Sequence, residues 1–554
     1  MALPIFQLGD RAILVTLGDR IAPKVNDQVV ALYERLVDIA DSRIDFLTPA
    51  FCSLGIGYNP ETISFDDLSK LVQQQFELIQ TTGGREPRVV RIPVCYSIDF
   101  GVDLQHVAET TGLTCEQVIE LHTSKTYRAY MLGFLPGFAY LGSVDQRLRV
   151  DRKLEPRMQV AMGSVGLAGE QTGVYPFEAP GGWQIIGRSP VSLYDRIEDS
   201  QNHDGQEGEG PLLVSPGDDV QFYQIDRAEF DSLFEQNHVV GEPIQNAVTQ
   251  QEAAGVSLHF KTAGLRTVLQ DLGRSGYQHL GVPSGGAMDR FSATIANRLV
   301  GNANDAALIE VTLMGPTIEI QGDCQIAITG GDLSPMLDGQ PVAMWETIPV
   351  TGTQRLSFGS RRSGCRCYLA IAGEFQLPSW LGSVSVSPSG ANPATAYRSL
   401  KGDTLEVVAG SQINNKRIFP AARRPVGLAE TEGQTVEVEK TVQFFPGPEW
   451  DWFPAEQQEK FLNHRFKILP SSSSMGLRLS SFLDHPLEQS AMISSAVVPG
   501  VIQVTPSGQP ILLMRDAQTT GGYPRIGVVR YEWLNEVAQL CPGDSIRFDL
   551  ETSR

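Results

Sequence analysis

The sequence predicts a mainly β protein made of several similar β-rich units, with a small α+β domain at its N-terminus. A Gly-Asp turn followed by alternating apolar residues occurs three times, at 216–222, 402–407 and 542–548. This pattern is typical of a strand that closes a β-hairpin. Because the copies are separated by domain-scale distances, they indicate that one kind of β-rich unit is repeated.

A second phrase recurs with Gln, Thr, Gly, Tyr and Pro in the same order. One copy occupies 171–176 and the other 518–524. Polar residues are costly to place in an apolar core unless their hydrogen bonds are satisfied. Two copies of a polar phrase therefore predict a pair of binding surfaces.

Length and composition exclude several classes of protein. A chain of 554 residues is too long for one core, so three or four domains are expected. The shares of hydrophobic residues (42%) and charged residues (19%) are typical of a folded protein. A net charge of −20 disfavours nonspecific binding to nucleic acid or to an anionic membrane. We therefore expect neither nucleic acid nor a membrane as partner.

The cysteines and the apolar stretches indicate the compartment. Seven scattered cysteines without a Cys-x-x-Cys motif predict reduced, mostly buried thiols. No signal peptide is recognisable at the N-terminus. The uncharged stretch 489–514 is interrupted by Ser, Gln, Pro and Gly, which favours strands over a membrane span. These features predict a soluble, cytoplasmic protein.

The distribution of apolar residues predicts where each unit begins and ends. In the N-terminal domain, apolar residues of 23–40 share one helical face, and 64–67 resemble the capping box of a second helix. Both helices would cover one face of a small sheet. The predicted units are the α+β domain 1–85, a barrel domain 86–240, a linker 241–255, and two further β-rich units at 256–425 and 426–554.

The linker 241–255 has no apolar periodicity and lies between two strand-rich blocks. Few contacts should cross such a segment, so we expect cleavage there to leave both halves folded. An acidic, glycine-dotted stretch at 199–210 is predicted to be a loop inside the preceding unit.

Several familiar signatures of catalysis are absent from the sequence. It contains no phosphate-binding loop of the Walker type, no Gly-x-Gly-x-x-Gly, no His-Glu-x-x-His and no Gly-x-Ser-x-Gly. The eight histidines lack ligand spacing, which argues against a zinc site. No Met-Lys pair is present that could carry biotin. A nucleotide, if bound, must occupy an unusual site.

The first polar cluster, at 179–188, combines a glycine turn with an aromatic and a basic residue. The backbone N–H groups of Gly181 and Gly182 could form an anion nest beside Trp183. Arg188 could clamp a carboxylate or phosphate, and Arg157 lies in a similar polar turn. The alternative is an ordinary surface arginine next to a turn.

The second cluster, at 278–290, precedes a predicted helix. Ser284 and Gly285 lie where the N–H groups of a helix start attract anions. His279 could transfer protons, although a lone histidine is more often structural. Asp289 is interpreted equally well as a functional carboxylate and as a helix N-cap.

The third cluster follows the apolar strand 511–514. Asp516 opens it and supplies a carboxylate at a strand end. The remaining candidates are the polar residues Gln518, Thr519, Thr520 and Tyr523. A glycine turn is the alternative interpretation, but the recurrence of the phrase favours ligand binding.

Together these phrases resemble one family group. Residues 1–240 resemble the B component of bacterial ATP-dependent 5-oxoprolinase, also called the sporulation-kinase inhibitor family or allophanate hydrolase subunit 1. Residues 256–550 resemble the C component of that enzyme, the antagonist family or allophanate hydrolase subunit 2. The matching phrases are 133–138, 163–165, 180–183 and 187–188 in the first half, and 270–274, 284–289, 381–383 and 516–524 in the second. The pair also resembles the carboxyltransferase region of urea amidolyase.

The resemblance implies cyclophilin-like β-barrels, one in the N-terminal half and two in the C-terminal half. It implies a fused B/C component that uses ATP and Mg²⁺ to phosphorylate the lactam carbonyl of 5-oxo-L-proline. A separate A-type subunit would then open the ring to L-glutamate, and homo-oligomers are also compatible with the family. The sequence departs from the family at Ser474, where an Arg is usual, and at Glu374, where a Gly is usual.

We place the predicted site between the two halves, where 516–524 and 284–289 would meet Trp183 and Arg188. Asp516, His279 and Asp289 are the catalytic candidates, and the remaining named residues would hold phosphates or orient the lactam. Two alternative functions stay open. One is carboxyl transfer from carboxybiotin, as in urea amidolyase, and the other is non-enzymatic regulation of a histidine kinase.

Overall fold

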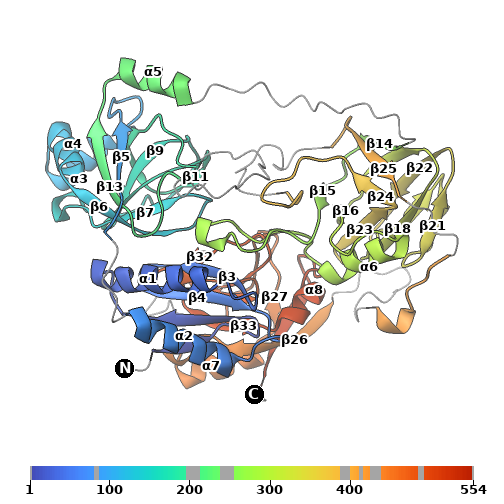
Figure 1. Ribbon diagram of the computed structural model, residues 1–554. Coiled ribbons are helices and arrows are strands. Elements are labelled where there is room, and N and C mark those ends of the chain that lie inside the picture. Colours follow the sequence, from blue (N-terminus) through green and yellow to red (C-terminus); the bar gives the residue numbers. More distant parts are fainter. Residues whose placement is uncertain are drawn as a thin grey trace.

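The computed structural model describes residues 3–79, 86–194, 212–237, 255–386, 400–410, 416–424, 438–483 and 492–551. Its elements are mostly strands, so the expectation of a mainly β protein with a few helices is confirmed (Figure 1). The acidic stretch 199–210 lies outside the described residues, as does the predicted linker except for Gly255. No helix in the described ranges is long and apolar enough to cross a membrane.

The N-terminal domain is a four-stranded antiparallel sheet covered on one face by two helices (Figure 1). Helix α2 begins as expected: the N–H of Asp67 donates to Ser64 Oγ at 3.1 Å, and the Ser64 hydroxyl donates to the Asp67 carboxylate at 2.8 Å. In sheet order the strands are β1 (Ile5–Gln7), β2 (Ala12–Thr16), β4 (Ser53–Tyr58) and β3 (Ile44–Pro49), with helices α1 (Pro23–Ile39) and α2 (Phe65–Ile79).

The second unit is a seven-stranded sheet that curls until its edges meet. The edge strands β5 (Val89–Val94) and β12 (Gln184–Arg188) are joined where Cys95 and Arg188 exchange backbone hydrogen bonds of 2.9 and 3.0 Å. Between them lie β9 (Ser164–Ala168), β10 (Gln171–Val174), β7 (Ala139–Gly142), β6 (Thr126–Leu132) and β13 (Asp219–Gln224). The remaining elements are β8 (Arg157–Val160), β11 (Ala179–Gly181), α3 (Leu104–Thr111), α4 (Cys115–Thr123) and α5 (Arg227–Asn237).

The third unit has two sheets, of seven and five strands, with α6 (Arg290–Val300) packed on the smaller one. The larger sheet contains β20 (Gln340–Pro341), β19 (Pro335–Leu337), β22 (Thr353–Phe358), β17 (Thr317–Gln321), β14 (Val256–Thr262), β25 (Thr404–Ala409) and β24 (Gly373–Phe375). The smaller contains β15 (Arg266–Gln270), β16 (Leu308–Thr312), β23 (Arg366–Ile371), β18 (Cys324–Gly330) and β21 (Thr347–Val350).

The last unit repeats the curled seven-stranded arrangement of the second. Its edge strands meet at a bridge between Ile468 and Leu479. Its strands in order are β27 (Phe466–Lys467), β34 (Ser545–Leu550), β26 (Glu439–Pro446), β33 (Arg525–Val529), β30 (Val501–Val504), β31 (Pro510–Leu513) and β28 (Gly476–Arg478). A short pair, β29 (Ser495–Ala496) and β32 (Thr520–Gly521), and helices α7 (Ala455–Asn463) and α8 (Leu534–Val537) complete it.

The recurring Gly-Asp phrase has the same geometry in the two curled units. Asp218 and Asp544 each accept, at 2.8 Å, the N–H of the residue three positions earlier, which closes the turn. The strand that follows runs parallel to the first strand of its unit, β13 beside β5 and β34 beside β26. The expected hairpin is therefore wrong for these two copies, because the partner is not the preceding strand.

The N-terminal sheet packs against the last unit, which is distant in sequence (Figure 1). A side chain at Gly55 would start only 2.3 Å from Cβ of Ala496, so the two backbones touch directly. Around this contact a buried apolar cluster draws on both halves, with Leu8 and Ala12 against Val497, Val501, Leu513, Ala517 and Val528. The expectation that few contacts connect the halves is therefore wrong.

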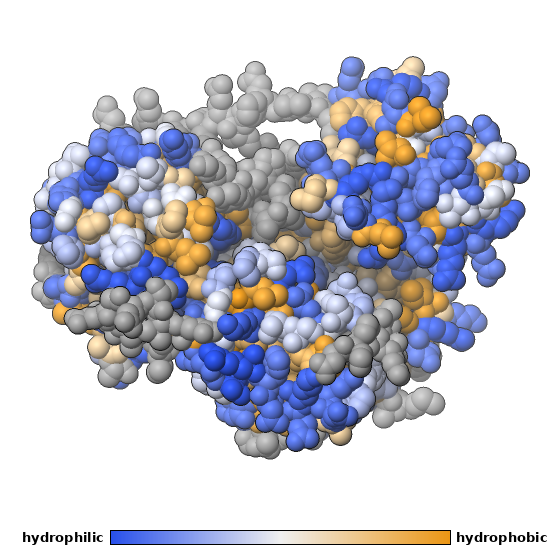
Figure 2. Space-filling view, turned by 180° about the vertical axis from the view of Figure 1, so that it is seen from behind, coloured by the Kyte–Doolittle hydropathy of each residue, from blue (hydrophilic) through white to orange (hydrophobic). Residues whose placement is uncertain are grey.

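The face of the molecule seen from behind is mostly hydrophilic, with scattered hydrophobic patches (Figure 2). This agrees with a core that is divided among several buried clusters inside the units and between them.

Cleavage between 238 and 254 should leave one complex and not two separable halves. Burial of apolar area on both sides of the interface favours association, by about 25 cal/mol per Å². Gel filtration of the cleaved protein, or of co-expressed 1–237 and 255–554, checks this, and elution as two smaller species would contradict it. Gly55→Leu should weaken the association because it collides with Ala496, whereas Gln74→Leu, on an exposed position of α2, should not.

Candidate functional site

Three of the phrases noted in the sequence come together where the two halves of the chain touch. The N–H of Gly285 donates to the carbonyl of Arg515 at 3.1 Å. A side chain at Gly133 would begin 2.2 Å from Thr520 Oγ1, and one at Gly281 would begin 2.8 Å from the carbonyl oxygen of Leu135. The loop 133–138 of the second unit therefore lies directly against 280–286 and 516–520.

Asp516 is the most unusual residue at this junction. Its side chain is almost fully buried, and neither carboxylate oxygen accepts a hydrogen bond from a described residue. Burial raises the pKa of Asp516 to about 6, against the opposing influence of the Ser474 hydroxyl and the positive charges of Arg266 and Arg274. A buried carboxyl that titrates near neutrality and lacks partners is a candidate for proton transfer or ligand binding.

Arg274 faces the same space from the third unit. Its Nη2 donates to the carbonyl of Ser385 at 2.7 Å, and its guanidinium carbon lies 4.7 Å from the centre of the Trp380 ring. A side chain at Gly285 would begin 3.3 Å from Arg274 Nη1 and 3.6 Å from Asp516 Oδ1. The glycine, with a positive φ of 60°, thus leaves open the space between a cation and a carboxyl.

Asp271 holds the loop that positions Arg274. Its carboxylate accepts the hydroxyls of Ser383 and Ser385 and the N–H groups of Gly273 and Val384. The same loop carries Trp380, whose Nε1 donates to the Tyr194 hydroxyl of the second unit at 3.1 Å.

Other buried polar atoms nearby also lack partners among the described residues. Both side-chain atoms of Gln270 are unpaired, and alternation along β15 puts this amide on the same face as Arg266. Thr519 Oγ1 and Gln503 Nε2 are unpaired as well, and Gln503 lies against Gly521. An unsatisfied buried polar group costs about 1–3 kcal/mol, so these atoms indicate that a ligand or water completes the site.

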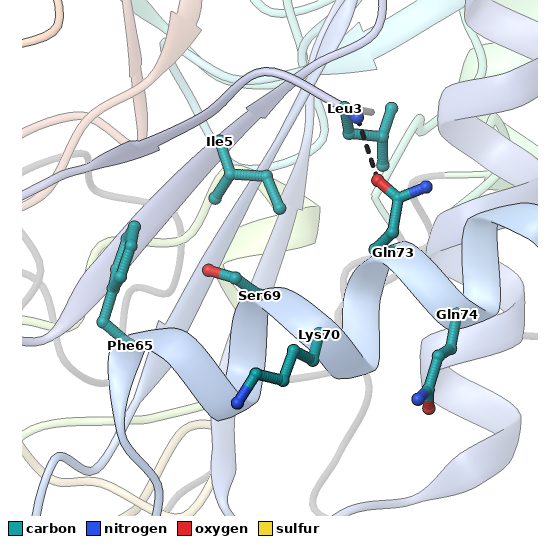
Figure 3. Close-up of a pocket in the computed structure, with 7 residues that line it drawn as sticks. All are labelled: Leu3, Ile5, Phe65, Ser69, Lys70, Gln73 and Gln74. Atoms are coloured by element: carbon teal, nitrogen blue, oxygen red, sulfur yellow. Dashed lines mark hydrogen bonds between the residues drawn. The ribbon is translucent and has the colours of Figure 1, made fainter. Parts of the chain in front are cut away.

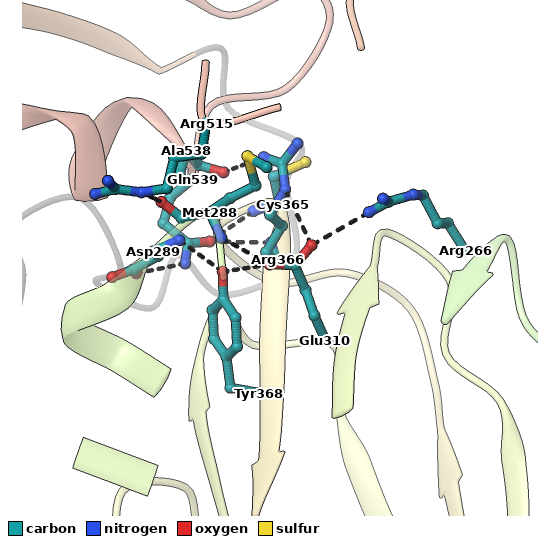
Figure 4. Close-up of polar contacts among 10 residues, drawn as sticks. All are labelled: Arg266, Met288, Asp289, Glu310, Cys365, Arg366, Tyr368, Arg515, Ala538 and Gln539. Carbon is teal, nitrogen blue, oxygen red and sulfur yellow. Dashed lines mark hydrogen bonds and ion pairs between the residues drawn. The ribbon is translucent and has the colours of Figure 1, made fainter. Parts of the chain in front are cut away.

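A network of buried charged residues, joined by hydrogen bonds and ion pairs, lies beside this junction (Figure 4). Fully buried Glu310 accepts the N–H of Met288 and the Tyr368 hydroxyl, both at 2.9 Å, and pairs with Arg266 at 3.2 Å. These contacts fix the backbone at the start of α6, two residues before the helix begins.

Asp289 belongs to this network and not to the open space. It accepts the N–H and hydroxyl of Ser292 at 2.9 and 2.6 Å and Gln539 Nε2 at 2.8 Å. Asp289 is therefore a helix N-cap, and the prediction that it is catalytic is wrong. Ser284, whose carbonyl accepts the N–H of Arg274 at 2.8 Å, lies at the junction as expected.

His279 packs on the N-terminal domain. Its ring lies 5.9 Å from that of Tyr33 on α1, and burial lowers its pKa. No hydrogen bond or ion pair within the described ranges joins its side chain to Asp516. The structure therefore favours the structural interpretation of this histidine.

The basic residues predicted in the second unit have other partners. Arg157 forms a two-pronged ion pair with Asp103, with two bonds of 2.7 Å. Arg188 donates to the carbonyl of Met162 at 2.8 Å and lies 5.4 Å from the Phe234 ring of α5. The expected meeting of Arg188 with 516–524 is therefore wrong.

Trp183 and its glycines contact other residues of the second unit. The Trp183 ring packs edge-on against Phe138 at 5.3 Å, behind the loop that touches Thr520. Gly181 allows the Tyr175 hydroxyl to approach, because a side chain there would begin 2.2 Å from it, while Gly182 lies over Pro156 and the Lys153 carbonyl.

The two copies of the polar phrase differ in role. In the first, Thr172 is fully buried and bonds His122 Nε2 at 2.9 Å and the Gly166 carbonyl at 3.1 Å. Burial lowers the pKa of His122 to about 3, so this histidine is neutral. The expectation of two binding surfaces is therefore wrong, because this copy is part of a core with satisfied hydrogen bonds.

Only the second copy borders the junction. Thr519 and Thr520 are buried, Gln518 is half-buried and Tyr523 is exposed. Sequence reasoning missed Gln270, Arg274 and Gln503. The first two stood inside the phrase 270–274 that carried the resemblance, and this was the only signal for them.

A separate groove of about 500 Å³ lies between β1 and α2 (Figure 3). Leu3, Ile5 and Phe65 form its apolar side, and Lys70 and Gln73 border it from the helix. None of the candidate residues lines this groove. Among the described residues no group of three or more His, Cys, Asp or Glu side chains is arranged to hold a metal ion.

Comparison with known proteins relates both halves to one set of enzymes. Residues 280–550 match the family model of the carboxyltransferase domain, subdomains A and B, and residues 3–203 match that of subdomains C and D. The first half is similar to the 5-oxoprolinase B component of Bacillus subtilis, with 36% identity over 42% of this chain and 98% of the relative. The second is similar to the 5-oxoprolinase C component of Escherichia coli, with 32% identity over 52% of this chain and 88% of the relative.

Two further similarities concern longer stretches. Urea amidolyase of Saccharomyces cerevisiae is 32% identical over 55% of this chain, which corresponds to 17% of that enzyme. The crystal structure of TTHA0988 is similar over 97% of this chain and 99% of its own, with a TM-score of 0.80 and 30% identity.

Asp516→Asn should stabilise the protein at pH 8, whereas Asp289→Asn should destabilise it. The pKa of Asp516 is raised from 3.8 to about 6 in the folded state. Its ionised form therefore opposes folding by up to about 3 kcal/mol above pH 6, and this penalty disappears as the pH falls toward 4. Asparagine removes the charge and keeps a carbonyl oxygen that can face the Ser474 hydroxyl.

At Asp289 the same change leaves at least one of three donors unpaired, at a cost of about 1–3 kcal/mol. Urea unfolding of both variants and the wild type at pH 8 and pH 5 measures the difference. Equal destabilisation by the two substitutions would mean that Asp516 has partners like those of Asp289.

Proposed function

Because the chain belongs to the family of carboxyltransferase-domain proteins that includes the B and C components of 5-oxoprolinase, we propose that it is a fused B/C component of an ATP-dependent 5-oxoprolinase. Its relatives are named as two subunits of one enzyme, and here both stand on a single chain. The observation that carries the proposal is the unpartnered Asp516 at the junction of the two halves.

The chemistry requires activation of an amide. Resonance makes a lactam carbonyl a poor electrophile, and phosphorylation of its oxygen creates a good leaving group. In this step the carbonyl oxygen attacks the γ-phosphorus of ATP, the bond to ADP breaks, and the lactam N–H loses its proton. Asp516, with a pKa near 6, would accept that proton when ionised.

The other groups at the junction suit binding and orientation. Arg274 Nη1, beside Gly285, would offer a positive charge to the lactam carboxylate or to a phosphate. The amides of Gln270 and Gln503 and the hydroxyl of Thr519 have unused donors and acceptors for the lactam ring. Because they are already buried, they need little reorganisation when the substrate binds.

Magnesium would enter with the nucleotide. The described residues provide a single free carboxylate at this place, which suits an ion held mainly by phosphate oxygens and water. The ion neutralises charge on the phosphates when bound. An A-type subunit would complete the reaction, because opening the activated ring needs water and a hydrolytic site.

The purified chain alone should form no glutamate from 5-oxoproline, and it should do so with ATP, Mg²⁺ and an A-type subunit. Asp516→Asn should lower kcat by on the order of 10²–10⁴ through loss of the proton acceptor. Arg188→Ala is the control, because its guanidinium faces α5, and it should keep kcat and KM. Full kcat in Asp516→Asn would remove Asp516 from the mechanism, and glutamate from the chain alone would refute the need for a partner.

A second candidate function is transfer of a carboxyl group from carboxybiotin. The name of the matching family models and the similarity to urea amidolyase favour it. The same junction would then bind the urea-type acceptor, and Asp516 would take its N–H proton. Two assays together would favour this function over the first. The chain would consume carboxybiotin when urea is present, and it would consume no ATP when 5-oxoproline is present. The comparisons offer no observation in favour of a histidine-kinase regulator.

A further inference from the structure

Tyr531 lies where the N-terminal domain, the start of α6 and the last unit meet. Its backbone N–H donates to Asp10 Oδ1 at 3.0 Å. Its hydroxyl oxygen accepts Arg290 Nη1 at 2.9 Å and Arg515 Nη1 at 3.2 Å. The guanidinium of Arg11, from the N-terminal sheet, stands 4.3 Å from the centre of its ring.

Three guanidinium groups thus surround one phenol, and no ion pair of the described residues neutralises any of them. Arg515 is almost fully buried and uses its other donors on the carbonyl of Met288 and on Asn535. Burial, together with the charge of Arg515, lowers the pKa of Arg290 to about 10.

The carboxylates near this cluster have other partners or act from a distance. Asp10 accepts the Tyr531 N–H, and Asp289 is taken by Ser292 and Gln539. Asp45 and Asp271 influence Arg11 and Arg290 only through the electrostatic field. The neighbouring Glu532 pairs with Arg530 at 3.2 Å. Asp289 likewise acts on Arg515 through the electrostatic field. No carboxylate of the described residues therefore forms an ion pair with any of the three guanidinium groups.

We propose that Tyr531 ionises in the neutral pH range in the folded protein, then acts as the counter-charge of Arg11, Arg290 and Arg515, and is a positioning residue for the loop beside Asp516. The positioning role rests on the function proposed above, whereas the ionisation of Tyr531 does not.

Electrostatics supports the ionised form. Burial alone would raise the pKa of Tyr531, but Arg515, Arg290 and Arg11 outweigh it and lower the pKa from 10.0 to about 7. A neutral phenol would also need an acceptor for its own proton, while both guanidinium donors already point at the oxygen. The anion instead accepts two charge-assisted hydrogen bonds, which are stronger than neutral ones.

Arg290 and Arg515 connect Tyr531 to the candidate site through hydrogen bonds. Arg290 Nη2 donates to the carbonyl of Gly285 at 3.3 Å, and Arg515 Nε donates to that of Met288 at 3.1 Å. The N–H of Gly285 donates in turn to the carbonyl of Arg515. Arg290 and Arg515 therefore hold the two ends of the segment 285–288, and the same two guanidinium groups also donate to the Tyr531 hydroxyl. Gly285, at one end of the segment, lies beside Asp516 Oδ1.

A pH titration of the full chain by near-ultraviolet absorbance tests the ionisation without any enzyme assay. An ordinary tyrosine ionises near pH 10, so a single tyrosinate that appears between roughly pH 6 and 8 is the expected signal. Tyr531→Phe should abolish it. Tyr223→Phe is the matched control, because Tyr223 has one arginine over its ring, Arg91 at 5.1 Å, and the signal should persist.

Absence of a tyrosinate below about pH 9 in the folded wild type would overturn the proposal. Persistence of the signal in Tyr531→Phe would overturn it as well. The wild-type titration needs no variant to fold. Arg11→Met should raise the midpoint, since it removes one of three cations, and an unchanged midpoint would exclude the N-terminal domain from the cluster.

Stability provides a second, independent measurement. The pKa of Tyr531 is lower in the folded state, so its ionisation stabilises the fold progressively from pH 7 up to about 10 and contributes nothing below. The stability difference between wild type and Tyr531→Phe should grow over that range, and a constant difference would contradict the proposal.

Activity then separates the two proposals. If the tyrosinate is present and 5-oxoproline turnover fails, the function is wrong and the ionisation stands. If turnover occurs, Tyr531→Phe should lower kcat more than it raises KM. It should also remove the part of the rise of kcat that is expected near pH 7, while the rise expected from Asp516 near pH 6 should remain. An unchanged pH profile of kcat would reject the positioning role.

Discussion

Direct backbone contact between the two halves of the chain is the constraint on which the candidate site depends. Gly133, Gly281 and Thr520 come from three different β units, and a β-carbon on either glycine would overlap its neighbour. Glycine is required because only a bare α-carbon lets the chains approach this closely. The contact brings the loop 133–138 onto the segment that begins with Asp516, so the junction is a property of both halves together.

The same contact explains why the N-terminal domain belongs spatially to the last unit. Its sheet packs on β29 through Gly55 and Ala496, and Arg11 reaches the ring of Tyr531. The 5-oxoprolinase relatives are named as two subunits, B and C, whereas the two similar halves stand on one chain here. Joining them on one chain raises the effective concentration of each half for the other and keeps the junction assembled at any dilution.

The buried carboxylates at this junction and in the second unit are of two kinds. Those that accept hydrogen bonds have a structural role, and the one that accepts none is the candidate for chemistry. Asp289, Glu310 and Asp103 are buried and each accepts several hydrogen bonds, so they define helix starts and loops. Asp516 is equally buried and accepts none from the described chain. Such a group is maintained against its own desolvation cost, which is the usual sign of a functional carboxyl.

The sequence by itself determined the mainly β class, the start of α2 at Ser64, the strands after the Gly-Asp turns and the phrases 284–289 and 516–520 that do meet. These depend on local alternation, turn chemistry and capping, which act over a few residues. Tertiary structure alone decided that Arg157 pairs with Asp103, that Arg188 faces α5 and that Thr172 is core. It also decided that Arg274 and Asp516 lie on either side of Gly285. Whether a polar side chain is satisfied depends on neighbours that are distant in the sequence, 54 positions for Arg157 and Asp103 and 50 for Thr172 and His122, and no local pattern encodes such contacts.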